Sequence, residues 1–246
     1  MSTLQQVKKT EPKAPRIIIY GEAGLGKSTF GAGARRPIFI PTEDGLGQLN
    51  VEAFPLATTY EDIIESIGEL YTGSHDYETV VLDSLDWLEP LIWNRVCEDH
   101  GIKSIEGLGY GKGYIEALRY WRAVFEGLTA LRDERGMVVL MTAHSQIMHI
   151  EDPTSTVYDM HTLKLHKRAG ALAEEFADVV GFAAVKVMTK SEDTGFNNKR
   201  TRAITTGERL LHVDANPAYT AKTRYTMPGS MELSWASFEN AMQGEQ

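Results

Sequence analysis

Short apolar runs alternate with amphipathic stretches along most of the chain. The apolar runs are continuous, as strands buried on both faces require; they span residues 16–20, 37–41, 78–82 and 137–142, with a short further strand expected at 54–57. Between them, apolar residues recur every three or four positions, which predicts helices at 27–35, 60–71, 85–100 and 114–135. The alternation predicts an α/β fold with a mostly parallel sheet and helices on both faces.

The pattern changes after Thr142. Residues 145–162 are polar and mixed, so a long loop and a loose hairpin both remain open. A short helix is predicted next, followed by strands joined by turns; these elements span 167–176, 179–188, 202–205 and 209–213. The segment SEDTGFNNK, residues 191–199, has the composition of a hairpin tip. We therefore expect a C-terminal antiparallel extension, whereas the last thirty residues give no assignable element.

The chain is expected to form one main domain. Its 246 residues and 42% hydrophobic content suit a globular domain with a sizeable core. The polar first fifteen residues hold two prolines and no apolar periodicity, which predicts a flexible N-terminal arm at 1–15. The domain is then assigned to 16–230 and a C-terminal tail to 231–246. No apolar run approaches the roughly 20 residues of a membrane span, so no membrane partner is predicted.

Charge and cysteine content narrow the functional classes. The net charge is −9, so a contact with nucleic acid would need a local basic patch. The densest such patch is LKLHKRAG, residues 163–170, which either touches nucleic acid or forms a solvent-facing first helical turn. The single cysteine, Cys97, excludes an intrachain disulfide and is typical of a reducing compartment, which predicts a cytoplasmic protein.

One motif carries specific chemistry. The stretch GEAGLGKS, from Gly21 to Ser28, matches G-x-x-x-x-G-K-[ST] and lies between a predicted strand and a predicted helix. Small residues let backbone N–H groups surround phosphates, Lys27 reaches the β- and γ-phosphates, and the Ser28 hydroxyl binds Mg²⁺. A glycine-rich turn that binds nothing is the weaker alternative in this context. The predicted nucleotide-binding residues are Gly21, Glu22, Ala23, Gly24, Leu25, Gly26, Lys27, Ser28 and Thr29.

A second acid is needed to hold the metal. The run TVVLDS ends a predicted buried strand at Asp83, which is expected to bind Mg²⁺ directly or through water. Asp83 as the N-cap of the following helix is the alternative, and Ser84 could also serve as that cap. The chain has no N-K-x-D motif of the kind that reads guanine, which favours ATP as the nucleotide.

With these motifs placed, the chain resembles RecA-like P-loop ATPases, and more narrowly the small phage-encoded ATP-binding proteins of that superfamily. Some of those proteins assist single-strand annealing and recombination. The resemblance follows the order of elements over roughly residues 16–230. It implies that Glu43, in FIPTEDG, polarises the attacking water and that Asp83 is the metal-linked acid. It also implies that a polar residue after strand 137–142 senses the γ-phosphate, here His144, where glutamine is usual in RecA itself.

The resemblance also implies contacts beyond one chain. Lys222 and Arg224 match basic residues that reach the γ-phosphate bound by a neighbouring subunit in rings and filaments, although an ordinary solvated charge pair is an equal alternative. The implied partners are therefore ATP, single-stranded DNA, a single-strand-binding or recombinase protein, and further copies of the chain. The candidate DNA loops are 105–114 and 147–162; the first is otherwise a flexible helix connector whose tyrosines fold back on the core, and the second is poor in basic residues.

These residues and the resemblance together leave three candidate functions, of which the resemblance implies the first. The first is an Mg²⁺-dependent ATPase that assists phage DNA recombination or single-strand annealing in the host cytoplasm. The second is a small-molecule or nucleotide kinase, for which no acceptor-binding signature is visible. The third is a nucleotide-switched adaptor with little turnover.

Overall fold

The computed structural model describes residues 9, 11–151, 156–193 and 199–244. The strands are β1 (Arg16–Gly21), β2 (Pro37–Pro41), β3 (Glu52–Ala53), β4 (Thr79–Asp83), β5 (Val138–Ile150), β6 (Tyr158–Leu163), β7 (Val179–Asp193), β8 (Lys199–His212), β9 (Lys222–Thr223) and β10 (Ser230–Glu232). The helices are α1 (Lys27–Ala32), α2 (Tyr60–Thr72), α3 (Leu85–His100), α4 (Lys112–Arg135), α5 (Lys167–Phe176) and α6 (Trp235–Gln243), and a 3-10 turn, η2, spans Ile105–Leu108.

The strands form one sheet in the order β10-β8-β7-β1-β5-β4-β2-β3. The run from β7 to β3 is parallel, whereas β8 and β10 are antiparallel additions beside β7. The short strand β9 pairs antiparallel with β7, and β6 pairs antiparallel with β5. The predicted α/β fold with a mostly parallel sheet and a C-terminal antiparallel extension is therefore confirmed.

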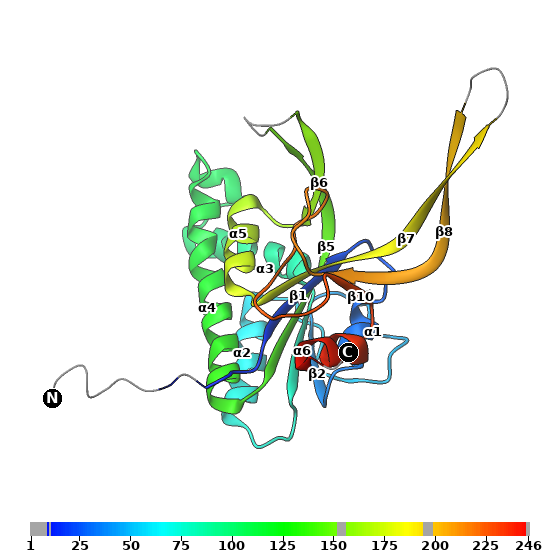
Figure 1. Cartoon of the computed structure of the whole chain (residues 1–246). Coiled ribbons are helices and arrows are strands. Elements are labelled where there is room, and N and C mark those ends of the chain that lie inside the picture. Colours follow the sequence, from blue (N-terminus) through cyan, green and yellow to red (C-terminus); the bar gives the residue numbers. More distant parts are fainter. Residues whose placement is uncertain (1–8, 10, 152–155, 194–198, 245–246) are drawn as a thin grey trace.

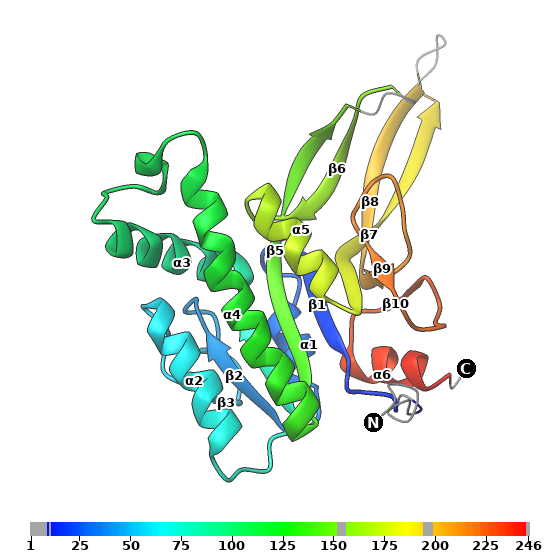
Figure 2. The ribbon, with the colours of Figure 1, turned by 90° about the vertical axis from the view of Figure 1, so that its left-hand side faces the viewer.

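Helices cover both faces of the sheet. Helices α2 to α5 lie on one face and α1 and α6 on the other, as Figures 1 and 2 show. The side chains of β1 alternate between the two layers, as strand geometry requires. Ile18 and Tyr20 pack under α2 to α5, whereas Ile17 and Ile19 pack with Phe30 of α1 and Phe238 of α6. This double burial explains why the strand is apolar at every internal position.

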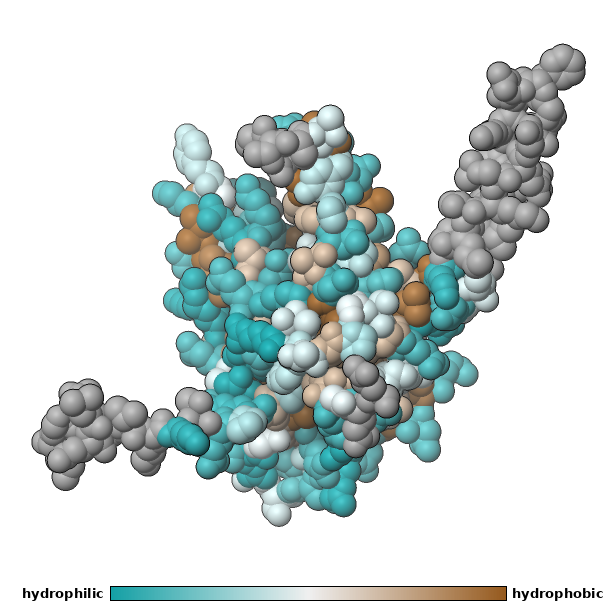
Figure 3. Space-filling view, in the orientation of Figure 1, coloured by the Kyte–Doolittle hydropathy of each residue, from teal (hydrophilic) through white to brown (hydrophobic). Residues whose placement is uncertain are grey.

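The visible surface is mostly hydrophilic. Figure 3 shows hydrophilic residues over most of one face, with hydrophobic residues in small separate areas. Within the described residues, every helix is too short or too polar to cross a bilayer.

Two long hairpins leave the sheet beyond the end of β1 (Figure 2). Strand β5 does not stop at Thr142 but runs on to Ile150, where its outer half pairs with β6, so the segment 145–162 contains a hairpin rather than an unpaired loop. The three short strands expected after residue 179 are instead the two long strands β7 and β8. The tip predicted at 191–199 lies partly outside the described residues.

Two sequence expectations change at smaller elements. The short strand expected at 54–57 lies earlier, at β3, and Phe54 only donates one backbone hydrogen bond to Phe39 O at 2.9 Å. The predicted C-terminal tail contains α6, whose Trp235 and Phe238 are 5% and 0% exposed in the core beneath Phe30. We therefore propose that the domain continues through α6. Most of the predicted N-terminal arm lies outside the described residues.

Candidate functional site

The ends of four parallel strands bring the predicted residues together. In the register of the sheet, Gly21 of β1 lies beside His144 of β5, and Pro41 of β2 lies beside Asp83 of β4. Strands β5 and β4 are neighbours, so the four strand ends form one continuous edge. Glu43 follows β2 by two residues at the same edge. Binding sites of open parallel sheets form at such carboxyl ends.

The loop between β1 and α1 needs its glycines. Gly24 and Gly26 have φ angles of 77° and 94°, in a region that side chains disfavour. A Cβ on Gly21 would lie 2.4 Å from the carbonyl oxygen of Ala183 on β7, so a larger residue cannot fit there without movement. The loop therefore has the tight backbone curvature that a phosphate cradle requires.

Lys27 is buried beneath this loop, with 6% of its surface exposed. Its Nζ donates to Gly21 O at 3.2 Å and Glu22 O at 2.9 Å, and in the described part of the chain it forms no ion pair with a carboxylate. Burial lowers the pKa of Lys27, while the nearby carboxylates of Asp83 and Glu43 raise it in part. A buried ammonium held only by carbonyls suits an anionic ligand, so the loop fits a polyphosphate.

Asp83 is positioned by threonines at the ends of the flanking strands. It is 2% exposed, and the Thr142 hydroxyl of β5 donates to Oδ1. Thr42, just after β2, donates its backbone N–H to Asp83 O at 2.7 Å and its hydroxyl to Ser84 O at 2.7 Å. The N-cap position of α3 belongs to Ser84, so Asp83 does not cap the helix. Its carboxylate chemistry fits a divalent cation held together with Ser28.

Glu43 is half-buried at the end of β2. Burial raises the pKa of Glu43 above its usual range, and the carboxylate of Asp83 adds to the rise, while His144 and Lys27 oppose it. A carboxylate with a raised pKa is a stronger proton acceptor than a solvated one. Lys27, Asp83 and His144 are all among its charged neighbours, so the structure brings the four predicted catalytic residues together.

Asp86 is a further site residue that sequence reasoning missed. Its side chain is 3% exposed, Oδ1 accepts from His144 N at 2.8 Å, and Oδ2 lies 2.8 Å from His144 Nδ1. Lys164 Nζ lies 4.0 Å from the same carboxylate. Asp86 thus holds both the backbone N–H and the imidazole of His144 in place. The available signal was an acid in the first turn of α3, three residues after Asp83.

Lys222 and Arg224 do not join this site in the same chain. Lys222 of β9 pairs with Val180 of β7, and Arg224 Nη1 lies 2.8 Å from Asp178 Oδ1. Asp178 also accepts from Arg16, the first residue of β1. At about 3.3 Å per residue, the start of β1 lies roughly 17 Å from its end at Gly21. Both basic residues therefore lie near the amino end of β1, at the end of the sheet opposite to the strand-end site.

The candidate loop at 105–114 has two interpretations, a DNA loop or a connector whose tyrosines fold back on the core, and its two tyrosines differ in this respect. Tyr114 stacks on His166 with ring centroids 4.0 Å apart, and its hydroxyl donates to Glu106 at 2.5 Å. Tyr110 is fully exposed. One tyrosine thus folds back onto the protein, and the other faces solvent.

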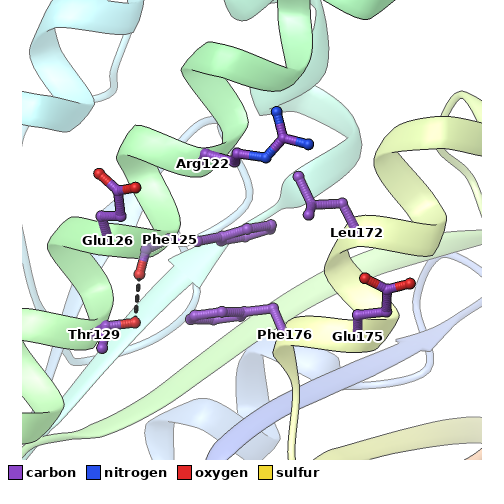
Figure 4. A pocket seen from close by; sticks show the side chains of 7 residues that line it. All are labelled: Arg122, Phe125, Glu126, Thr129, Leu172, Glu175 and Phe176. Atoms are coloured by element: carbon purple, nitrogen blue, oxygen red, sulfur yellow. Dashed lines mark hydrogen bonds between the residues drawn. The ribbon is translucent and has the colours of Figure 1, made fainter.

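A cavity of about 320 Å³ lies elsewhere, between α4 and α5 (Figure 4). Phe125 and Phe176 line it and stack directly on each other with centroids 4.3 Å apart, and the Thr129 hydroxyl donates to Phe125 O at 2.7 Å. Phe176 lies under the guanidinium of Arg16, at the amino end of β1. None of the predicted site residues lines this cavity, so it is separate from the strand-end site.

Comparisons with known proteins bear on the family and the fold of the chain. A family model described as an AAA domain matches residues 13–225. The SPbeta prophage-derived uncharacterized protein YorG of Bacillus subtilis (strain 168) is 26% identical over 168 residues, which cover 67% of this chain and 49% of that protein. The chain thus spans about half the length of this curated relative. A crystal structure of the RadB recombinase aligns over 81% of each chain, with a TM-score of 0.46 and 13% identity. The family model, which matches most of the chain, confirms the predicted resemblance to P-loop ATPases.

Proposed function

Because the chain belongs to the AAA domain family of P-loop ATPases, we propose that it binds ATP with Mg²⁺ at the strand-end site and hydrolyses it. The observation that supports this best is the convergence of Lys27, Glu43, Asp83 and His144 at one edge of the sheet, beside a loop that requires glycine.

The reaction is the attack of water on the γ-phosphorus, with release of ADP and phosphate. Glu43 orients the water and accepts its proton, a role that its raised pKa supports. Lys27 neutralises charge on the phosphate oxygens, and His144, held by Asp86, contacts the terminal phosphate. Ser28 and Asp83 would hold Mg²⁺, which supplies charge neutralisation at the β- and γ-phosphates when bound.

We further propose that hydrolysis serves phage DNA recombination or single-strand annealing in the host cytoplasm. The prophage origin of the relative supports the phage setting. Lys222 and Arg224 lie far from the site of their own chain, which supports a contact with the nucleotide of a neighbouring copy in a ring or filament. Single-stranded DNA and a single-strand-binding or recombinase protein are the proposed partners.

The test compares ATP hydrolysis by the wild type, Lys27→Ala, Glu43→Gln and Asp44→Asn. We expect no hydrolysis by Lys27→Ala and at least a roughly 100-fold lower kcat for Glu43→Gln, because general-base catalysis contributes about 10²–10⁴-fold. Asp44→Asn is the matched control, since it neutralises the exposed neighbouring carboxylate and should keep wild-type turnover.

Each alternative function gives a different result in the same assay. ADP release that strictly requires an added acceptor would identify a kinase. Tight ATP binding with negligible turnover, even with single-stranded DNA, would identify an adaptor. Unchanged turnover of Glu43→Gln beside an inactive Lys27→Ala would remove Glu43 from its proposed role. Sizing with and without ATP and single-stranded DNA tests the proposed assembly.

A further inference from the structure

Strand β8 carries a basic residue past the carboxyl end of β1. Across β7, Leu211 of β8 is in register with Ala183, which is itself in register with Gly21 of β1. Arg209 pairs with Val185, two residues farther out on β7. We call the loop from Gly21 to Ser28, between β1 and α1, the phosphate loop. At about 3.3 Å per residue, Arg209 therefore lies roughly 7 Å beyond the end of β1, where the phosphate loop begins.

The face on which Arg209 lies is fixed by strand alternation. Residues two apart in a strand share a face, so Arg209 points to the same side as Leu211. Leu211 is fully buried in the layer that holds Leu25 of the phosphate loop and Phe30 of α1. Arg209 thus lies on the side of the sheet that carries the phosphate loop.

A β-bulge lies directly before Arg209 in β8. The register of β7 and β8 shifts between Val185 and Val187, and Gly207 in the bulge has a φ of 77°. Bulges change the direction of a side chain and occur often beside active sites. Glu208, the next residue, pairs with Lys186 at 2.9 Å, and the backbone of Arg209 accepts from Leu233 N at 3.0 Å. The bulge and this hydrogen bond hold the Arg209 backbone in place.

The guanidinium reaches the phosphate loop itself. A Cβ built on Gly26 would lie 2.9 Å from Arg209 Nη1, so the guanidinium contacts the residue directly before Lys27. Across the described residues, we find no carboxylate that forms an ion pair with Arg209. The residue is exposed, so its charge faces solvent beside the loop and needs no buried partner.

We propose that Arg209 is a phosphate ligand that acts in cis, on the nucleotide bound by the phosphate loop of its own chain. The guanidinium donates two parallel N–H groups to phosphate oxygens, a geometry that a lysine cannot reproduce. This inference rests on the proposed ATP site and assigns that site an internal arginine, distinct from Lys222 and Arg224. The ligand class is a nucleoside di- or triphosphate.

The test measures dissociation constants for ADP and a non-hydrolysable ATP analogue by titration calorimetry. Loss of a charge-assisted hydrogen bond should weaken binding of both ligands by Arg209→Gln roughly tenfold or more, and Arg209→Lys should recover only part of the affinity. Lys186→Gln is the matched control, because it removes an exposed cation from the same hairpin near the bulge. Its affinity should equal that of the wild type, and both Arg209 variants should keep the wild-type Tm.

The outcomes separate this inference from the proposed function. Lys27→Ala measured in parallel should lose binding; if the wild type itself fails to bind either nucleotide, the proposed function is wrong. If the wild type binds, Lys27→Ala does not, and Arg209→Gln binds as tightly as Lys186→Gln, the assignment of Arg209 is wrong. Mixing Arg209→Gln with Lys27→Ala tests the cis geometry, because restored hydrolysis in the mixture would show that Arg209 acts between chains.

Discussion

The two Asp–His pairs of this protein offer a direct measurement of what burial contributes at the site. Asp86 and His144 form a pair in which the carboxylate is 3% exposed, with Oδ2 2.8 Å from Nδ1. His149 and Asp159 form a pair of nearly the same length, 2.7 Å, in which both side chains are 67% exposed. The chemistry is matched, so a difference between the two pairs reports their surroundings.

We expect Asp86→Asn to lower the free energy of unfolding by about 2 kcal/mol, because hydrogen bonds to charged groups contribute about 1.5–3 kcal/mol each. The asparagine oxygen can still accept from His144 N, but its amide nitrogen cannot accept from Nδ1–H. Asp159→Asn should cost less than about 1 kcal/mol, as exposed ion pairs do. At about 2–4 °C per kcal/mol for a chain of this size, the Tm of Asp86→Asn should fall by about 4–8 °C.

Urea unfolding followed by tryptophan fluorescence measures both variants, since the chain has four tryptophans. The comparison requires equal m-values, because a change in m reports a change in the surface exposed on unfolding. Equal losses for Asp86→Asn and Asp159→Asn would refute the reasoning, because burial would then contribute nothing to the pair at the proposed nucleotide site. A double-mutant cycle with His144→Ala should give a coupling energy larger than the cycle with His149→Ala.

Three other substitutions test proton linkage and packing. Burial raises the pKa of Glu89 to about 7, so the folded state holds a proton that the unfolded chain releases above its ordinary value of 4.5. Wild-type stability should therefore fall by about 3 kcal/mol as pH rises from about 4.5 through 7, and Glu89→Gln should lack this fall when unfolding is measured at pH 5 and pH 8. Gly113→Ala places a Cβ 2.1 Å from Ile105 O and should cost about 1–3 kcal/mol. Gly68→Ala, in open space within α2, should instead gain about 0.5–1 kcal/mol, and calorimetric Tm values of the two variants check both signs.

The parts of the site that the sequence predicts can each be located from a local pattern in the chain. The phosphate loop is contiguous in sequence, and Glu43, Asp83 and His144 each follow an apolar run. Parallel strands place their carboxyl ends at one edge, so residues that follow such runs converge without any knowledge of side-chain packing. Asp86 and Arg209 have no such pattern, because their positions depend on a helical turn and on a bulge within a long antiparallel pair.

The hairpins show where apolar patterning stops being informative. Residues of β5 up to Ala143 are buried under helices and read as a strand, whereas the outer residues 145–150 are exposed or half-buried and mixed in character. Backbone pairing with β6 holds this outer half without a buried face. Patterning reports burial rather than hydrogen bonding, so a strand that leaves the core loses its signal while it keeps its structure.

The proposed roles of the basic residues differ in whether they require chains to associate. Arg209 contacts the phosphate loop of its own chain, whereas Arg224 is held by Asp178 near the opposite end of the sheet. A residue that acts in cis contributes at every protein concentration, and one that acts in trans contributes only after chains associate. If both proposals hold, nucleotide affinity is set within a single chain, and the rate of hydrolysis rises with assembly. Affinity that is constant while turnover per chain increases with protein concentration is therefore the signature that joins the two proposals.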